Sequence, residues 1–184
     1  NLGNTGIGTS AYIDTRILSE LFGVKLNIVM GYPGSADKRI AIERGELDGD
    51  CGSWTSMPEE WLRDNKITVH IRYSRNLVPG MPATAVAARD LLADPRKQQI
   101  FGLLTASAVI GRPYIAPKGV PADRVAALRA AFDATMKDPE FLADSEKQKL
   151  IVTPMTGPEV ETYIKELYGT PPDIIAAARE ISSE

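Results

Sequence analysis

Residues 3–30 read GNTGIGTSAYIDTRILSELFGVKLNIVM, a glycine-rich loop followed by a helical pattern and then by a strand pattern. Apolar residues recur at helical spacing over Ile13–Phe22, and Gly23 is placed to end the helix in a left-handed turn. Val24–Met30 combines β-branched and apolar residues, which is typical of a strand. This succession predicts the first part of a layered α/β fold.

The alternation of helix and strand patterns continues as far as Tyr73. Its clearest strand is Ile67–Tyr73, in which apolar and polar residues alternate, so we expect one covered face and one solvated face. Such a regular alternation predicts the α/β class. The elements expected in between are a turn over 31–35, a short helix from the N-cap Ser35 to Gly45, a strand over Leu47–Cys51 and a helix that starts near Ser56.

The chain beyond residue 79 is expected to be mostly helical. The exception is a segment in which Pro113 and Pro117 oppose a helix. The C-terminal third therefore presents helices for which this chain supplies little sheet. The expected elements are a helix from about Thr84, a helix capped by Asp94 with Pro95 at its first position, an extended segment over 108–116, two amphipathic helices after Pro121 and a lone strand over Leu150–Val152.

The composition of the 184-residue chain is that of an ordinary globular protein, with 43% hydrophobic and 24% charged residues. Its net charge of -3 argues against a surface that neutralises nucleic-acid phosphates, and no apolar run reaches the ~18 residues of a membrane span. A single cysteine, Cys51, and a single histidine, His70, exclude an internal disulfide and a Cys/His zinc site. The chain shows no signal peptide and does not begin with Met, so we expect a mature or trimmed fragment.

The glycine loop that enters the first helix is the sharpest chemical feature. Glycines allow successive N–H groups to converge on one point, and a helix N-terminus adds unpaired donors and a partial positive charge. Asn4, Thr5, Gly8, Thr9 and Ser10 therefore form a candidate cradle for a carboxylate or a phosphate. A tight strand-to-helix turn with ordinary capping by Thr9 or Ser10 explains the same residues. The local sequence leaves both interpretations open.

A dinucleotide site is the main alternative for this loop, because residues 6–11 fit the G-x-G-x-x-G/A fingerprint. That site needs an acidic residue at the end of the next strand, where this chain has Met30 and Gly31. We therefore interpret the match as accidental. The sequence also lacks a G-x-x-x-x-G-K-[ST] loop, which argues against a nucleoside triphosphate.

Acidic residues at positions 46, 48 and 50 raise the question of a cation site. If they began a calcium loop, Cys51 would stand where glycine is needed and Met57 where the bidentate Glu belongs. We interpret them as solvated and capping residues of a short strand, and we expect no metal. His70 has no serine or cysteine motif beside it, and Cys51 is expected to be a small apolar residue, so no catalytic residue is predicted.

Other candidates for the lining of a cleft lie farther along the chain. Arg112 stands among apolar residues that we expect to be buried, where its guanidinium either pairs with a buried acid or faces a cleft and suits a carboxylate. Trp61 is expected in the core, whereas Trp54 either lines a pocket or joins the core. Tyr32 and Ser53 are the remaining candidates for the cleft.

Taken in order, several short segments resemble those of the extracytoplasmic receptors of tripartite tricarboxylate transporters, the Bug-type solute-binding proteins. Residues 4–10 resemble the Ser-x-Gly-x-Gly-Thr/Ser loop of this family, and residues 30–35 resemble its Pro-Tyr-Lys-Gly-Gly turn. Residues 44–48 resemble a Gly-Gly-Gln-Val-Asp step of the family, and residues 81–84 resemble a Val-Pro-Thr step. Residues 116–121 resemble an Ala-Pro-x-Gly-Thr-Pro element, and Asp138-Pro139 follows before a helix. The order of these segments spans nearly all of the chain.

The resemblance implies a two-lobed periplasmic receptor with the type II periplasmic-binding-protein fold. Such a receptor closes on a small di- or tricarboxylate or a related organic acid and delivers it to the membrane subunits of a tripartite transporter, without catalysis, a cofactor, nucleic acid or direct membrane insertion. Residues 1–107 are then the second α/β lobe, with helices around a small mixed sheet. Residues 108–184 are the crossover strand and the C-terminal helices of a truncated first lobe.

The ligand contacts that the resemblance implies combine donors from both lobes. Three positions depart from the family pattern: Tyr12 replaces a usual His, Gly31 replaces a Pro, and Arg112 stands where an aromatic residue is common. The identity of the bound acid is therefore not implied. The expected contacts are Asn4, Thr5, Gly8, Thr9, Ser10, Tyr32, Ser53 and Arg112.

Two other function classes are compatible with the same sequence: a dinucleotide-binding enzyme domain and the effector-sensing domain of a transcriptional regulator. NAD binding would support the first class. The residues encoded upstream of Asn1 would distinguish the second class from a transport receptor, because a signal peptide supports transport and a helix-turn-helix supports regulation. Since one lobe is expected to be largely absent, we expect this chain alone to bind a dicarboxylate in the millimolar range or more weakly.

Overall fold

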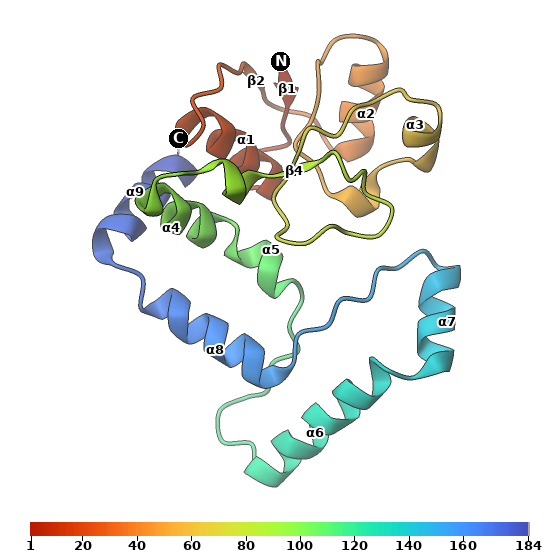
Figure 1. Ribbon diagram of the computed structural model, residues 1–184, viewed down its shortest axis with the longest axis vertical. Coiled ribbons are helices and arrows are strands. Elements are labelled where there is room, and N and C mark those ends of the chain that lie inside the picture. Colours follow the sequence, from red (N-terminus) through yellow and green to blue (C-terminus); the bar gives the residue numbers. More distant parts are fainter. Residues whose placement is uncertain (184) are drawn as a thin grey trace. The chain divides into compact units, whose positions relative to one another are not determined.

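The structure, a computed structural model, describes residues 1–183 (Figure 1). The described chain is an α/β protein that consists mostly of helices, with two short pairs of parallel strands. Its residues form two compact units. Unit 1 comprises Asn1–Ala106 together with the segment from Pro171 onward, and unit 2 comprises Ser107–Thr170. The α/β class predicted from the alternating patterns is confirmed.

The strands of unit 1 pair in parallel. β1 (Leu2–Gly3) pairs with β2 (Ile28–Val29), and Leu2 also forms an isolated parallel bridge with Gly49. β3 (Ile71–Arg72) pairs with β4 (Val86–Ala87). Because parallel strands place their carboxyl ends at one edge, the residues that follow β1, β2 and Gly49 meet at the same edge. The single mixed sheet that the resemblance implies is replaced, in the described residues, by two separate parallel pairs.

The helices of unit 1 begin and end at local signals. α1 (Ser10–Glu20) starts after its N-cap Thr9, and the chain leaves it through Gly23, which has a φ of +70°. α4 (Pro95–Leu104) starts after Asp94, whose carboxylate accepts a hydrogen bond from the N–H of Arg96 at 2.8 Å, as the Asp-Pro pair predicts. The other helical elements are α2 (Ser35–Glu43), η1 (Trp54–Ser56), α3 (Glu59–Arg63), η2 (Ala88–Leu91) and α9 (Pro172–Ser182), while α5 (Ala106–Ile110) begins in unit 1 and ends in unit 2.

The core of unit 1 is built by α1, α4, η2 and α9. Ile17 on α1 is fully buried, and burial of such a side chain contributes about 1.5–3 kcal/mol. Tyr73 follows β3 and stacks on Phe101 of α4, with ring centroids 5.8 Å apart. The helix α9, which the resemblance assigns to the first lobe, packs here against α1 and α4. The buried core residues are Ile17, Leu21, Ala88, Leu92, Ile100, Phe101, Ile174, Ala178 and Ile181.

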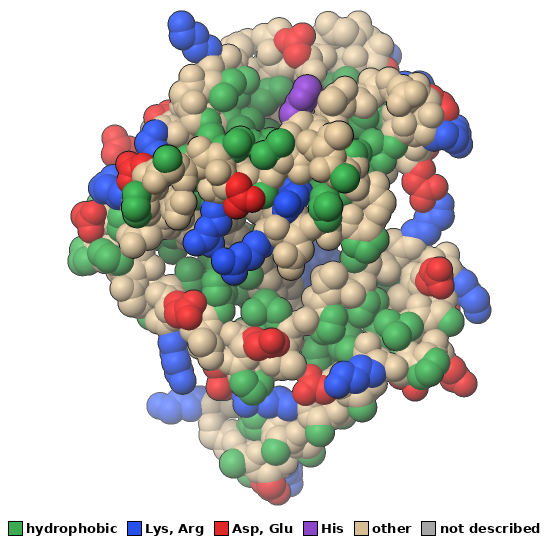
Figure 2. Space-filling model, in the orientation of Figure 1, with side chains coloured by type: hydrophobic (Ala, Val, Ile, Leu, Met, Phe, Trp, Pro, Cys, Tyr) green, Lys and Arg blue, Asp and Glu red, His purple; other side chains and the backbone are tan. Residues whose placement is uncertain are grey.

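Unit 2 contains the helices α6 (Ala122–Thr135), α7 (Pro139–Lys147) and α8 (Gly157–Tyr168). Asp138 caps α7 by accepting hydrogen bonds from the N–H groups of Glu140 and Phe141. Large apolar side chains of this unit remain exposed, among them Tyr114 (91%), Ile115 (89%) and Tyr168 (88%). Figure 2 shows hydrophobic side chains at the surface of the molecule. The expectation of helices with little sheet holds for unit 2, since no strand lies in its described residues.

The strands are shorter than the sequence predicts. Only Ile28–Val29 of the expected strand 24–30 pairs, only Ile71–Arg72 of the expected strand 67–73 pairs, and the expected strand 47–51 is reduced to the bridge at Gly49. The alternation over 67–73 nevertheless separates an exposed face of this segment from a face that packs against the core. Thr68 and His70 are exposed, whereas Ile71 and Tyr73 pack against the core.

Four other expectations about local structure are wrong. The helix expected from Thr84 is replaced by β4 and η2, because Val86–Ala87 pairs with β3. The first part of the expected extended segment 108–116 is helical, since α5 continues to Ile110. Residues 150–152 form no strand. Ser35 is the first residue of α2 rather than its cap, a position that Gly34 takes.

Candidate functional site

The glycine loop connects β1 directly to α1. Gly8 has a φ of +76°, which glycine adopts without the steric cost that a Cβ brings. Thr9 closes the loop, because its hydroxyl donates to the carbonyl of Gly6 at 2.8 Å and accepts from the N–H of Tyr12 at 3.4 Å. Capping by Thr9, one of the two interpretations of this sequence, is therefore present. The Thr9 side chain is engaged with the loop itself, and its role toward a ligand stays a prediction.

Several amides of the loop remain without an acceptor. Within residues 1–183, the N–H groups of Gly8, Ser10 and Ala11 donate to no protein atom. A Cβ placed on Gly6 or Gly8 would meet no heavy atom within 4 Å, so the space beside the loop is open. Unpaired N–H groups at the start of a helix carry a partial positive charge. This arrangement can therefore hold an anionic group. The cap by Thr9 does not use these three amides, because its hydroxyl accepts from the N–H of Tyr12.

Asn4 fixes the loop to the strands and to α1. Its N–H donates to the carbonyl of Val29 at 2.8 Å, its carbonyl accepts from the N–H of Tyr32 at 3.3 Å, and its Nδ2 donates to Thr15 Oγ1 at 3.2 Å. The side chain is fully buried, and its Oδ1 has no hydrogen-bond partner in the described structure. Asn4 therefore acts as a positioning residue, and its backbone brings Tyr32 to the loop.

A second set of polar side chains lies beside the next turn of α1, where Asp14, Thr15, Cys51 and Tyr73 are neighbours. The Tyr73 hydroxyl donates to the backbone carbonyl of Asp14 at 2.6 Å. Burial raises the pKa of the Asp14 carboxyl to about 7 and the pKa of the Cys51 thiol to about 11. A thiol with that pKa is protonated at neutral pH, so Cys51 is not an activated nucleophile.

The sequence reasoning missed this cluster, which we call the Asp14 cluster. Its members lie on α1, after Gly49 and after β3, so they are far apart along the chain. One signal was available: Asp14 stands on α1 between Ile13 and Ile17, which both contribute to the core. An acidic residue placed within an apolar helical stripe indicates a buried carboxyl.

The acidic residues around position 48 have separate partners. The buried ammonium of Lys38 pairs with Asp50 Oδ1 at 2.6 Å. The side-chain amide Nδ2 of Asn1 donates to Asp48 Oδ2 at 3.0 Å. Among the residues that the structure describes, no group of three or more His, Cys, Asp and Glu side chains could hold a metal ion.

Ser53 and Arg112 are not joined to the glycine loop by any hydrogen bond in residues 1–183. Ser53 is exposed, and its hydroxyl lies 3.0 Å from the hydroxyl of Thr55. Arg112 belongs to unit 2 and is exposed, which differs from the buried surroundings expected for it. Its guanidinium pairs with no carboxylate of the described chain. The structure thus brings together Asn4, Thr5, Gly8, Thr9, Ser10 and the backbone of Tyr32.

The two tryptophans have different surroundings. Trp61 is 4% exposed and its Nε1 donates to Glu43 Oε1 at 2.9 Å, so its predicted place in the core is confirmed. Trp54 is half-buried, and its Nε1 donates to the carbonyl of Pro79 at 3.2 Å. Both indole N–H groups thus bond to groups outside the glycine loop.

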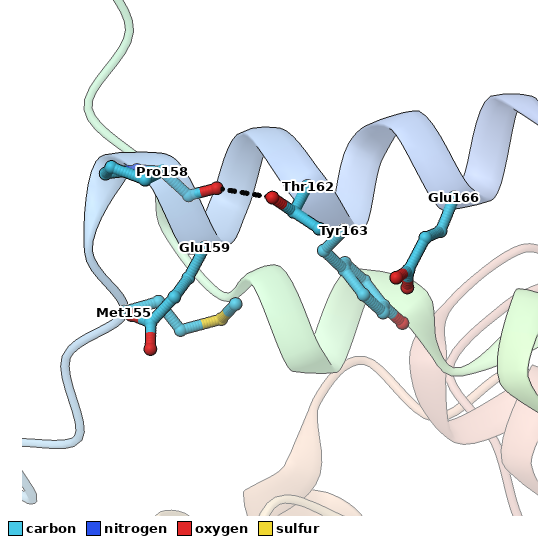
Figure 3. Close-up of a pocket in the computed structure, with 6 residues that line it drawn as sticks. All are labelled: Met155, Pro158, Glu159, Thr162, Tyr163 and Glu166. Atoms are coloured by element: carbon cyan, nitrogen blue, oxygen red, sulfur yellow. Dashed lines mark hydrogen bonds between the residues drawn. The ribbon is translucent and has the colours of Figure 1, made fainter.

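Two surface hollows lie away from the predicted residues. One, of about 280 Å³, is bordered by α1, α4 and α9, and its cations already have partners: Arg16 pairs with Glu20, and Arg96 pairs with Asp173. The other, of about 370 Å³, runs along α8 (Figure 3). Figure 3 shows Tyr163 and Glu166 on the same side of α8 and the Thr162 hydroxyl bonded to the Pro158 carbonyl. This second hollow is lined by Met155, Pro158, Glu159, Thr162, Tyr163 and Glu166.

Comparison with known proteins gives no relative from which a function could be carried over. No family model matches the chain, and neither a curated protein nor a solved structure matches it. Within residues 1–183, none of the helices combines the length and the apolarity that crossing a bilayer requires.

Proposed function

We propose that this chain is the ligand-binding part of an extracytoplasmic receptor for a small carboxylate. The observation that carries the proposal is the set of amides at Gly8, Ser10 and Ala11, which have no protein acceptor in the described chain and lie at the positive end of α1. The carboxyl-end edge of β1, β2 and Gly49 gives independent support. Ligands of open α/β sheets bind at this edge, and the glycine loop extends from it.

The number of open donors sets the affinity that we expect. A hydrogen bond to a charged group contributes about 1.5–3 kcal/mol, and association costs at least ~4 kcal/mol. Three such amides therefore leave at most about 5 kcal/mol of net binding energy, which corresponds to a dissociation constant near the millimolar range. This value agrees with the weak binding expected from the sequence for this chain alone.

The finer architecture belongs to the same proposal. We assign residues 1–107 to the second lobe of a type II periplasmic-binding-protein fold and residues 108–184 to the crossover strand and the C-terminal helices of the first lobe, which completes the grip on the ligand. The receptor would work in the periplasm and deliver its organic acid to the membrane subunits of a tripartite transporter. A binding role rather than a catalytic one is supported by the raised pKa of the Cys51 thiol, which leaves the cluster beside the loop without an activated nucleophile.

The experiment compares two threonine variants in titration calorimetry with succinate. Thr9→Ala removes the hydroxyl that ties Gly6 to Tyr12, so it should loosen the loop and weaken succinate binding about tenfold while the chain stays folded. Thr156→Ala is the matched control, because Thr156 caps α8 in unit 2 and its hydroxyl donates only to Glu159. Equal affinity of Thr9→Ala and Thr156→Ala would remove Thr9 from the site. No heat of binding from the unmodified chain at millimolar succinate would contradict the proposed function.

A further inference from the structure

The chain exposes more surface than compact folding of its two units would leave. Its accessible surface is 12400 Å². Two separate compact domains with the sizes of the two units, about 13 and 7 kDa, would together expose roughly 10,400 Å². The difference of roughly 2,000 Å² exceeds the ~800 Å² that each partner buries in a standard protein–protein interface. The uncovered surface is therefore large enough for a stable dimer.

The helices of unit 2 contribute to this uncovered surface. In the described chain, Ser145 is the one buried residue of α6, α7 and α8. Helices of 9 to 14 residues are marginal in water unless an apolar face packs against something. The apolar face of α8 consists of Val160, Tyr163, Ile164, Leu167 and Tyr168. Such a face indicates that unit 2 is stabilised by a partner.

The hollow along α8 combines apolar walls with a carboxylate that has no counter-charge. Met155, Pro158 and Tyr163 contribute apolar walls to its volume of about 370 Å³ (Figure 3). Glu166 lies on the same side of α8 as Tyr163, and its carboxylate pairs with no cation in residues 1–183. A group suited to this hollow therefore carries an apolar side chain with a cation close by.

The segment between α5 and α6 has this chemistry. Residues 112–117 read RPYIAP and belong to no helix or strand, and Ile115 is 89% exposed. The guanidinium of Arg112 is exposed and has no carboxylate partner in the described chain. Pro113 and Pro117 restrict the backbone on both sides of the apolar residues. Segments that proline has ordered in this way dock in aromatic-lined grooves at a low cost in entropy.

Within one chain, this segment lies beside α6 rather than in the hollow. Tyr114 packs on Phe132 of α6, with ring centroids 5.9 Å apart. In the described structure, none of residues 112–117 is among the residues that line the hollow. A second copy can bring its segment to the hollow without breaking the contact between Tyr114 and Phe132. Because every copy carries both the segment and the hollow, the contact forms twice about a two-fold axis and closes a dimer.

We propose that two copies of this chain form a symmetric dimer through unit 2. Ile115 of each copy enters the α8 hollow of the other, and Arg112 pairs with Glu166 of the other copy. Burial of apolar side chains supplies most of the affinity, whereas the ion pair fixes which segment meets which hollow. The inference goes beyond the proposed function, since it concerns no residue of the glycine loop.

The experiment measures the mass of the full chain by analytical ultracentrifugation from micromolar to submillimolar concentration. We expect a reversible equilibrium between monomer and dimer. Arg112→Glu and Glu166→Arg each place like charges in both contacts, so each should raise the dissociation constant at least about tenfold. An equimolar mixture of the two variants should restore the dimer, because both contacts of the mixed pair regain opposite charges. Damage to the fold by either variant would not be rescued in this way.

Arg124→Glu is the matched control, since Arg124 is exposed on α6 and pairs with no carboxylate of the described residues. It changes the net charge equally and should keep the dimer. Ile115→Ser leaves the charges in place and should also weaken the dimer at least about tenfold. A chain that stays monomeric at every concentration, a dimer that survives both charge reversals, or a mixture as weakly associated as its separate components would overturn the proposal.

Discussion

Replacing Asp14 by Asn should change how the stability of this protein depends on pH. The pKa of Asp14 is raised by burial from its ordinary value of 3.8 to about 7 in the folded chain. Below about pH 4 the carboxyl is neutral in both states, and between about pH 4 and 7 the unfolded chain releases its proton while the folded chain keeps it. The free energy of unfolding therefore falls over this interval as the pH rises.

The size of this loss follows from the two pKa values. Each pKa unit corresponds to about 1.4 kcal/mol, so a charged Asp14 destabilises the folded state by on the order of 4 kcal/mol above neutral pH. Asparagine has nearly the same shape and carries no charge, so Asp14→Asn removes the loss. Urea unfolding of both proteins at about pH 4 and about pH 8 should give similar stabilities at acidic pH and a clearly more stable variant at alkaline pH. Stability curves that run parallel across this range would refute the burial of this carboxyl.

Three further predictions concern the surroundings of the loop. Lys38→Met should destabilise the chain by about 2–4 kcal/mol in urea unfolding, because the half-buried Asp50 carboxylate loses its cation, and adding Asp50→Asn should restore part of the loss. An unchanged unfolding midpoint would contradict a contribution of this pair to stability. Cys51 should resist alkylation by iodoacetamide at neutral pH in the folded chain and react after denaturation, as followed by mass spectrometry, and rapid labelling of the folded chain would contradict its burial. Gly8→Ala should cost about 1 kcal/mol of stability, because alanine is strained at a φ of +76°, and thermal unfolding measures it; no loss would mean that the loop relaxes.

Local chemistry made much of the helical part predictable from the sequence. Asp94-Pro95 and Asp138-Pro139 both start helices, with the aspartate carboxylate accepting from backbone N–H groups, because the cap and its helix are neighbours along the chain. The end of α1 at Gly23 follows for the same reason.

The misjudged segments are those in which a distant partner decides the structure. The alanine-rich run after Thr84 favours a helix by itself, yet Val86–Ala87 pairs with β3 and is extended. Around Arg112, the effect of Pro113 on backbone conformation reaches only the preceding residue, so α5 can continue to Ile110.

The candidate site likewise has one part that local sequence predicts and one part that depends on distant contacts. The glycine loop was predictable, because its turn, its cap by Thr9 and its open amides all arise within a few residues. The Asp14 cluster was not, because Cys51 and Tyr73 reach α1 only through the packing of the strands. Burial of Asp14 follows from the apolar neighbours of that position on α1, but the contacts around it depend on tertiary packing, which for instance brings the Tyr73 hydroxyl to the Asp14 carbonyl.

The most direct measurement of the central claim is the change in backbone amide chemical shifts, residue by residue, when succinate is added to the full chain in two-dimensional NMR spectra. We expect the amides of Gly8, Ser10 and Ala11 to move downfield together and to saturate with one millimolar-range constant, while the amides at the start of α6 stay in place. Shifts that spread evenly over the chain, or that leave these three amides unmoved while others saturate, would contradict it.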